Sequence, residues 1–120
     1  MKRLRFSRSL RLRKSADFRR VQQGGRRVVT GELVVVYQPR PDAGPRFGLA
    51  VSRKVGNAVV RNRVKRWLRE SIRVERGALS EVDVVFIARK GAAVSGLAEL
   101  RLQVRGALDR IRRALRQKRT

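Results

Sequence analysis

The sequence predicts an α+β fold, a two-layer sandwich in which helices pack on one small sheet. A length of 120 residues suits a single domain, and a hydrophobic content of 42% supplies a modest core. Strand-like and helix-like segments follow in the order helix, two or three strands, helix, strand, helix. The net charge is +23, and the basic residues concentrate in the helix-like segments. We therefore expect a neutral sheet that carries basic helices.

A short helix is predicted to begin at Ser15 and to end at the pair Gly24-Gly25. The Ser15 hydroxyl can accept hydrogen bonds from the free N–H groups of the first turn. Asp17 suits the positive end of the helix dipole. Glycine commonly ends a helix, because it adopts the backbone conformation that a helix stop requires.

Three apolar runs have the composition of strands. They span residues 33–37, 47–52 and 82–88. The third is apolar enough for the centre of the sheet. Val28 and Val29 either begin the first strand or form a separate hairpin arm. Residues 38–45 contain all three prolines and are expected to form a loop.

Two further helices are predicted. The first covers residues 58–76, with Asn57 as its cap and Gly77 at its end. The second opens at Ser95-Gly96, and its apolar residues follow a spacing of three and four. This stripe consists of Leu97, Leu100, Val104, Leu108, Ile111 and Leu115. One domain is expected over residues 1–120, with loose basic arms at residues 1–12 and 117–120.

Composition restricts the chemistry. The chain contains neither cysteine nor histidine, which excludes a disulfide scaffold, a zinc site with nitrogen and sulfur ligands, and histidine-based acid–base catalysis. The nine acidic residues are scattered, so a stand-alone metal-dependent nuclease is disfavoured. A charge of +23 instead indicates a polyanionic partner, and nucleic acid is the natural one.

The segment VVRNRVKRWLRE, residues 59–70, divides into two faces when it is placed on a helix. Its apolar face holds Val60, Val64, Trp67 and Leu68. Its basic face holds Asn62, Lys65, Arg66 and Arg69, and continues to Arg73 and Arg76. One interpretation is an ordinary solvated surface. Like charges four residues apart repel each other, however, and such a face becomes favourable when it neutralises phosphates.

The run Ser52-Arg53-Lys54-Val55-Gly56-Asn57-Ala58-Val59-Val60-Arg61-Asn62-Arg63-Val64-Lys65-Arg66-Trp67-Leu68-Arg69-Glu70 closely resembles the signature of the protein subunit of bacterial ribonuclease P. Landmarks on either side agree in order, and the resemblance extends over about residues 10–115. It implies the order helix, three strands, helix, strand, helix, as in a ribosomal-protein-like domain. It also implies a small mixed sheet with an unusual left-handed crossover.

The resemblance implies two sets of binding residues. Those that bind the catalytic RNA would be Arg53, Asn57, Arg61, Asn62, Arg63, Lys65, Arg66 and Arg69. Those that bind the 5′ leader of precursor tRNA would be Phe18, Arg19, Gln22, Val36, Ser52, Lys54, Arg89 and Lys90. Two positions depart from the family pattern, because Gln22 and Val36 stand where relatives carry aromatic residues. Tyr37, next to Val36, is expected to face the other way.

The implied activity is an endoribonuclease that removes the 5′ leader of precursor tRNA. The catalyst would be the RNA subunit, with Mg²⁺ bound mainly by that RNA and no catalytic residue in this chain. The partners would be the catalytic RNA and precursor tRNA. The protein would be a monomer that forms a 1:1 complex with the RNA. It would act in the cytoplasm and bind no membrane. A basic ribosomal protein, or another protein that binds structured RNA, is the alternative that composition and size allow equally well.

Overall fold

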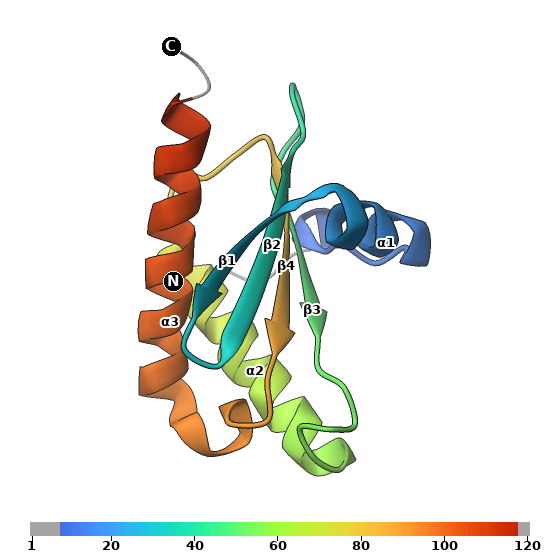
Figure 1. The fold of residues 1–120 in the computed structure, drawn as a ribbon, viewed down its shortest axis with the longest axis vertical. Helices are drawn as coiled ribbons and strands as arrows, with labels where there is room; N and C mark the ends of the chain where they lie inside the picture. Colours follow the sequence, from blue (N-terminus) through green and yellow to red (C-terminus); the bar gives the residue numbers. More distant parts are fainter. Residues whose placement is uncertain (1–7, 118–120) are drawn as a thin grey trace.

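A mixed sheet separates two layers of helix in residues 8–117, the part of the chain that the computed structural model describes (Figure 1). Its strands are β1 (Arg26–Thr30), β2 (Leu33–Pro39), β3 (Arg46–Ala50) and β4 (Val82–Ala88). Their spatial order is β1-β2-β4-β3, which places β4 inside the sheet as predicted. The residues Val28 and Val29 belong to a separate hairpin arm, β1, which pairs antiparallel with β2.

The only parallel pair of strands among the described residues is β3 with β4, and α2 (Ala58–Glu75) connects them. This crossover has the left-handed sense that the family resemblance implies (Figure 1). The helices α2 and α3 (Ala92–Gln117) cover one face of the sheet, and α1 (Ser15–Gly24) packs on the other. The predicted fold class is therefore confirmed.

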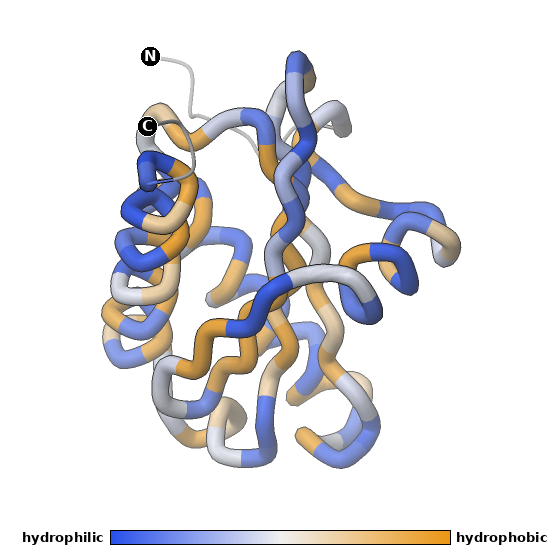
Figure 2. The backbone as a smooth tube through the Cα atoms, turned by 45° about the horizontal axis from the view of Figure 1, so that its top comes forward, coloured by the Kyte–Doolittle hydropathy of each residue, from blue (hydrophilic) through white to orange (hydrophobic). Residues whose placement is uncertain are grey.

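Strand alternation divides the core between the two faces. On the α2 side, Val35, Tyr37 and Phe86 pack with Val64 and Leu68 in the larger cluster. On the α1 side, a smaller cluster is formed by Leu12, Val21, Val36 and Val85. Hydrophobic residues accordingly follow the strands and the inner sides of the helices (Figure 2). No helix within residues 8–117 combines the length and the apolarity that crossing a membrane requires.

The first helix has its predicted bounds, since α1 spans Ser15–Gly24, but its cap and the start of the last helix differ from the predictions. Lys14, not Ser15, precedes α1, and no side chain caps this end. The α3 segment begins at Ala92, and Gly96 interrupts it with a φ of 82°. Leu97 therefore follows a kink and is 40% exposed, although it was predicted to join the apolar stripe. Four other members of the apolar stripe are buried as predicted, namely Leu100, Val104, Leu108 and Ile111.

The N-terminal segment packs more closely than expected. Leu12 is buried and donates its backbone N–H to the Phe47 carbonyl of β3 at 2.9 Å. A bridge between Arg11 and Phe47 extends the sheet edge at the same place. The prediction of a loose arm is thus wrong for residues 8–12, while residues 1–7 and 118–120 lie outside the described part. At the other end, Gln117 is the last residue of α3.

Glu75, at the end of α2, links this helix to α3. Its carboxylate accepts hydrogen bonds from Arg105 Nε at 3.0 Å and from Arg101 Nε at 2.8 Å. The hydrogen bond from Arg105, followed by that from Arg101, lowers the pKa of Glu75 from 4.5 to about 2. Arg112 also donates to the Glu75 backbone carbonyl. The end of α2 is therefore held to the middle of α3 by polar and ionic contacts above the apolar core.

Gly48→Ala is expected to destabilise the fold by about 1–3 kcal/mol, because the core must accept an extra methyl group. A Cβ at this position would lie 2.6 Å from Cζ of the Phe18 ring. The free energy of unfolding in urea measures the effect. Gly44→Ala is the matched control, since a Cβ there meets no atom within 4 Å. Equal stability losses in the two variants would contradict the packing of Phe18 on β3.

Glu75→Gln tests the ionic link between α2 and α3. Because folding lowers the pKa of Glu75, its contribution to stability is present above the ordinary value of 4.5 and is lost as the pH falls towards about 2. The difference in unfolding free energy between the wild type and Glu75→Gln should therefore narrow across that range. The control is Glu99→Gln, whose carboxylate contacts the neutral amide of Gln103. A constant difference for Glu75→Gln would contradict the link.

Candidate nucleic-acid interface

The helix α2 begins with a side-chain cap. Asn57 precedes the first turn, and its Oδ1 accepts a hydrogen bond from the Val60 backbone N–H at 3.0 Å, as predicted. The inward residues Val64, Leu68 and Ile72 are completely buried against the sheet. Trp67 packs at the border of the same core, which agrees with its predicted place on the apolar face. Cap and core together fix the direction in which the opposite face points.

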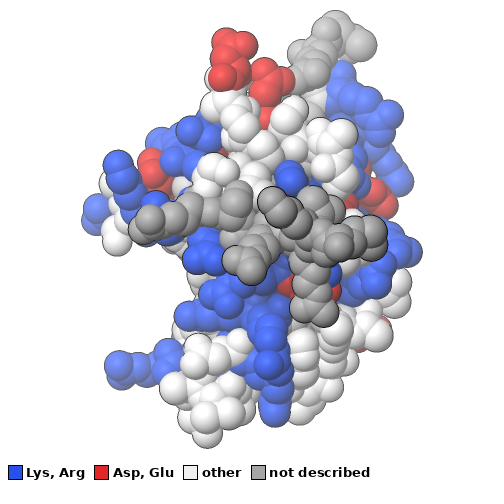
Figure 3. Space-filling view, turned by 180° about the vertical axis from the view of Figure 1, so that it is seen from behind, with Lys and Arg blue, Asp and Glu red and all other residues white. Residues whose placement is uncertain are grey.

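The opposite face carries a ridge of polar and basic side chains. This basic ridge consists of Asn62, Lys65, Arg66 and Arg69. Lys65 is half-buried, and the other three are exposed. Among the described residues, none of the four side chains has a hydrogen bond or ion pair. Seen from behind, Lys and Arg gather in a broad region with few acidic side chains among them (Figure 3).

Two residues next to the basic ridge, Arg63 and Arg73, have partners of their own. Arg73 pairs with Glu70 three residues earlier, so the continuation of the basic face towards Arg76 is partly neutralised. Arg63 Cζ lies 5.4 Å from the centre of the Trp67 ring, within cation–π range. Arg61 is half-buried, and its Nε has no hydrogen-bond partner within the described structure. On the outer face of α2, Lys65, Arg66 and Arg69 thus keep their positive charges unpaired within the described structure.

The other face of the sheet presents three rows of side chains, which follow from the strand register. The ionic row holds Gln38, Asp83 and Arg46. The middle row holds Val36, Val85 and Gly48, beneath Val21 and Phe18 of α1. The open row holds Val29, Val34, Ile87 and Ala50. Val29 is 48% exposed and the other three are half-buried, so this row forms an accessible apolar strip.

Several predicted leader-binding residues border the open row. Phe18 is half-buried against Gly48, and Gln22 lies one turn further along the same side of α1. Exposed polar residues follow the ends of the parallel strands β3 and β4, at one end of the row. They are Ser52, Lys54, Arg89 and Lys90. Arg19 is exposed on α1. The aromatic ring of Phe18, the apolar open row and a basic group at one end of the row thus occur on the same face of the sheet.

Val36 does not line this surface. It belongs to the middle row, is completely buried, and packs with Val21 under α1. Its assignment to the leader-binding set is therefore wrong, because α1 covers the part of β2 where it lies. Tyr37 faces the opposite side of the sheet and is buried in the larger core, as predicted.

The residues of the open row were missed in the sequence. Val29, Val34, Ala50 and Ile87 look like ordinary strand residues, and nothing in their types separates them from buried neighbours. Their common face depends on the pairing of β1 with β2 and of β2 with β4. The alternation of side chains within each strand can be read from the sequence, but the register that aligns one strand with the next cannot.

A pocket at the edge of β3 lies between Phe18 and the basic ridge. Its volume is about 230 Å³, and it is lined by Phe18 and Arg13 on the α1 side, and by Lys65 and Arg69 from α2. Among residues 8–117, no group of three or more acidic side chains is arranged to hold a metal ion. The lining of this pocket therefore offers basic and aromatic groups for binding.

Comparisons with known proteins identify the family of this chain. The model of the family described as Ribonuclease P matches residues 6–112. A ribonuclease P protein component of Desulfovibrio desulfuricans is 46% identical over 100 residues, which cover 81% of this chain and 77% of that protein. The corresponding protein of Rhodococcus erythropolis is 44% identical and covers 84% and 87%.

Solved structures are similar over comparable lengths. The ribonuclease P protein of Staphylococcus aureus superposes with a TM-score of 0.76 at 32% identity, over 83% of this chain and 93% of that one. The protein from Thermotoga maritima gives 0.75 at 30% identity, over 83% and 96%. With its fold and its sequence both in agreement, this chain belongs to the ribonuclease P protein family, the RNA-binding subunits of an enzyme that matures the 5′ ends of tRNA.

Proposed function

We propose that this chain binds two different RNA segments on opposite sides of its sheet. The basic ridge docks on the catalytic RNA, and the open row with Phe18 holds the single-stranded 5′ leader of precursor tRNA. The observation that carries this proposal is the separation itself. Unpaired basic side chains lie on α2, whereas the accessible apolar strip lies beside α1, across the sheet.

The ridge suits a structured RNA. Lys65 and Arg69 are four residues apart on one helix face and repel each other in the free protein. Neutralising phosphates removes this cost and releases counterions from the RNA. Asn62 adds directional donors and an acceptor among the charges. The proposed contact set also includes the neighbouring residues Arg53, Asn57, Arg61 and Arg63.

The open row suits an unpaired strand. Bases of any sequence can stack on an aromatic ring and rest on apolar surface, while basic groups contact the phosphates. Phe18 is the one ring available on α1, because Gln22 replaces a second aromatic residue. We infer that leader binding depends less on stacking in this protein, and more on Lys54, Arg89 and Lys90.

The chemistry is proposed to lie outside this chain. The holoenzyme would act as an endoribonuclease whose catalytic RNA binds the Mg²⁺ that the hydrolysis uses. What supports this is the absence of histidine and cysteine from the chain, together with the lack of a metal-binding acidic group in its described part. We propose one protein per catalytic RNA, acting in the cytoplasm.

Reconstitution tests the proposed function. The purified protein is added to its cognate catalytic RNA at low Mg²⁺, and the rate of leader removal from precursor tRNA is measured. We expect a large stimulation, because the protein offsets phosphate repulsion that Mg²⁺ no longer screens. Absence of stimulation, or cleavage by the protein without RNA, would refute the proposal.

Arg66→Ala should weaken binding of the catalytic RNA and lower the salt dependence of log K by about 1, because one phosphate contact is lost. Filter binding across a series of salt concentrations measures both quantities. Arg113→Ala is the matched control, since Arg113 is exposed on α3 and carries the same charge. If the two variants lose affinity equally, net charge and not the ridge determines binding.

Phe18→Ala should weaken binding of a precursor with a long leader by about 1–3 kcal/mol, the usual worth of one stacked base. A precursor with a one-nucleotide leader should bind as before. Phe18→Leu separates stacking from packing, because leucine can still cover Gly48 but offers no ring. Wild-type leader affinity in both variants, or unfolding of Phe18→Leu, would mean that Phe18 serves only the core.

A further inference from the structure

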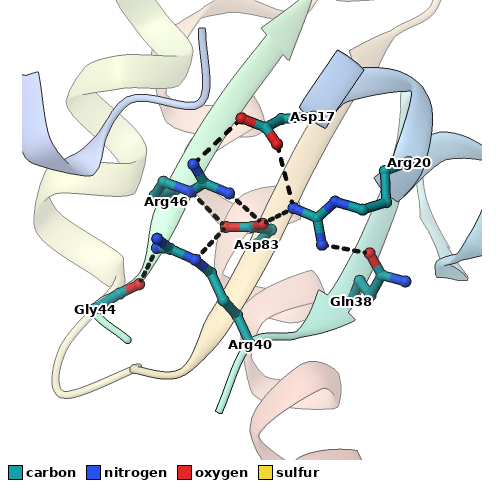
Figure 4. Close-up of polar contacts among 7 residues, drawn as sticks. All are labelled: Asp17, Arg20, Gln38, Arg40, Gly44, Arg46 and Asp83. Atoms are coloured by element: carbon teal, nitrogen blue, oxygen red, sulfur yellow. Dashed lines mark hydrogen bonds and ion pairs between the residues drawn. The ribbon is translucent and has the colours of Figure 1, made fainter. Parts of the chain in front are cut away.

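The central strand β4 contains a charged residue that solvent does not reach. Asp83 has no exposed surface and lies in the ionic row, on the side of the sheet that α1 covers. Arg46 of β3 holds its carboxylate with two hydrogen bonds, Nε to Oδ1 at 2.9 Å and Nη2 to Oδ2 at 2.8 Å. Arg20 of α1 donates a third, from Nη2 to Oδ2 at 2.8 Å (Figure 4).

A second carboxylate completes this cluster. Asp17 of α1 lies 3.3 Å from Arg46 Nη1 and 3.5 Å from Arg20 Nη2. Arg40, from the loop after β2, approaches Asp83 Oδ1 at 4.0 Å. Burial alone would raise the pKa of Asp83, but hydrogen bonds from Arg46 lower it below its ordinary value. Asp83 is therefore a buried anion on which three arginines from three elements converge.

The cluster holds one flank of α1, and the opposite flank borders the open row. Asp17 and Arg20, three residues apart, lie over the ionic row. Phe18 and Gln22, four apart, lie on the other flank. Among the ten residues of α1, only Val21 is completely buried. Apolar packing therefore fixes the orientation of α1 only weakly. The ionic contacts of Asp17 and Arg20 therefore hold the flank of α1 opposite Phe18.

We propose that Asp83 and Asp17 are positioning residues for the 5′ leader. They touch no RNA, but they hold α1 so that Phe18 and Gln22 border the strip on which the leader lies. This inference rests on the proposed function of the open row. By electrostatics alone, removing an acidic residue from a protein of net charge +23 should strengthen RNA binding. The positioning role predicts the opposite, a weaker binding of the leader.

Asp17→Asn is the decisive variant. Asp17 retains 25% side-chain exposure, so the change leaves no buried charge unpaired at the centre of the sheet. Glu99→Gln is the matched control, because it raises the net charge equally and lies on α3, on the other side of the sheet. The reconstituted holoenzyme is assayed for affinity towards precursors with a long leader and with a one-nucleotide leader.

We expect Asp17→Asn to lose about threefold to tenfold in affinity for the long leader, the usual net effect of one hydrogen bond. Affinity for the short-leader precursor and for the catalytic RNA should stay unchanged. Asp17→Glu should restore long-leader binding, since its carboxylate can reach the same arginines. Asp83→Asn, if it folds, should show a loss in the same direction. Glu99→Gln should bind both precursors at least as tightly as the wild type.

Two results would overturn the inference alone. One is a long-leader affinity for Asp17→Asn that equals or exceeds that of Glu99→Gln, and the other is an equal loss on both precursors. Neither result would contradict the proposed leader site at the open row, provided that the wild type binds the long-leader precursor more tightly than the short-leader one. If the wild type itself shows no such preference, the proposed function of the open row fails, and the positioning role fails with it.

Discussion

The fold depends on where a few acidic side chains neutralise an excess of arginine. With 32 basic and 9 acidic residues, unshielded repulsion opposes any compact arrangement of this chain. Asp83 and Asp17 form ion pairs with arginines from α1, β3 and the loop after β2. Glu75 does the same for α3. Positive charge is paired at the junctions between elements and is left unpaired on the basic ridge.

In the proposed function, the two faces of the sheet have different tasks. On one face, α2 has a complete apolar interior, so its outer residues are free to form a rigid basic ridge. On the other, α1 is too short to cover the sheet, and the open row stays accessible. The pocket at the β3 edge, between Phe18 and Lys65, is where the two RNA segments would come closest. In this proposal, a single sheet holds two RNA segments apart.

Local chemistry was predictable from the sequence, and pairing between distant segments was not. Asn57 and the apolar face of α2 follow from capping preference and helical periodicity, both of which are local. The left-handed crossover followed from family resemblance alone, since most crossovers are right-handed. Val36 was misassigned because its burial depends on where α1 lies across the sheet. Asp83 gave no signal, because its partners Arg20 and Arg46 are far away in the sequence.

Hydrogen–deuterium exchange tests the two-surface arrangement most directly. Exchange is compared for the free protein, for its complex with the catalytic RNA, and for the ternary complex with a long-leader precursor. The account predicts that the catalytic RNA protects α2, and that α1 with the strands of the open row gains protection only when the leader is present. Protection of α1 and the open row by the catalytic RNA alone, with α2 unchanged, would contradict it.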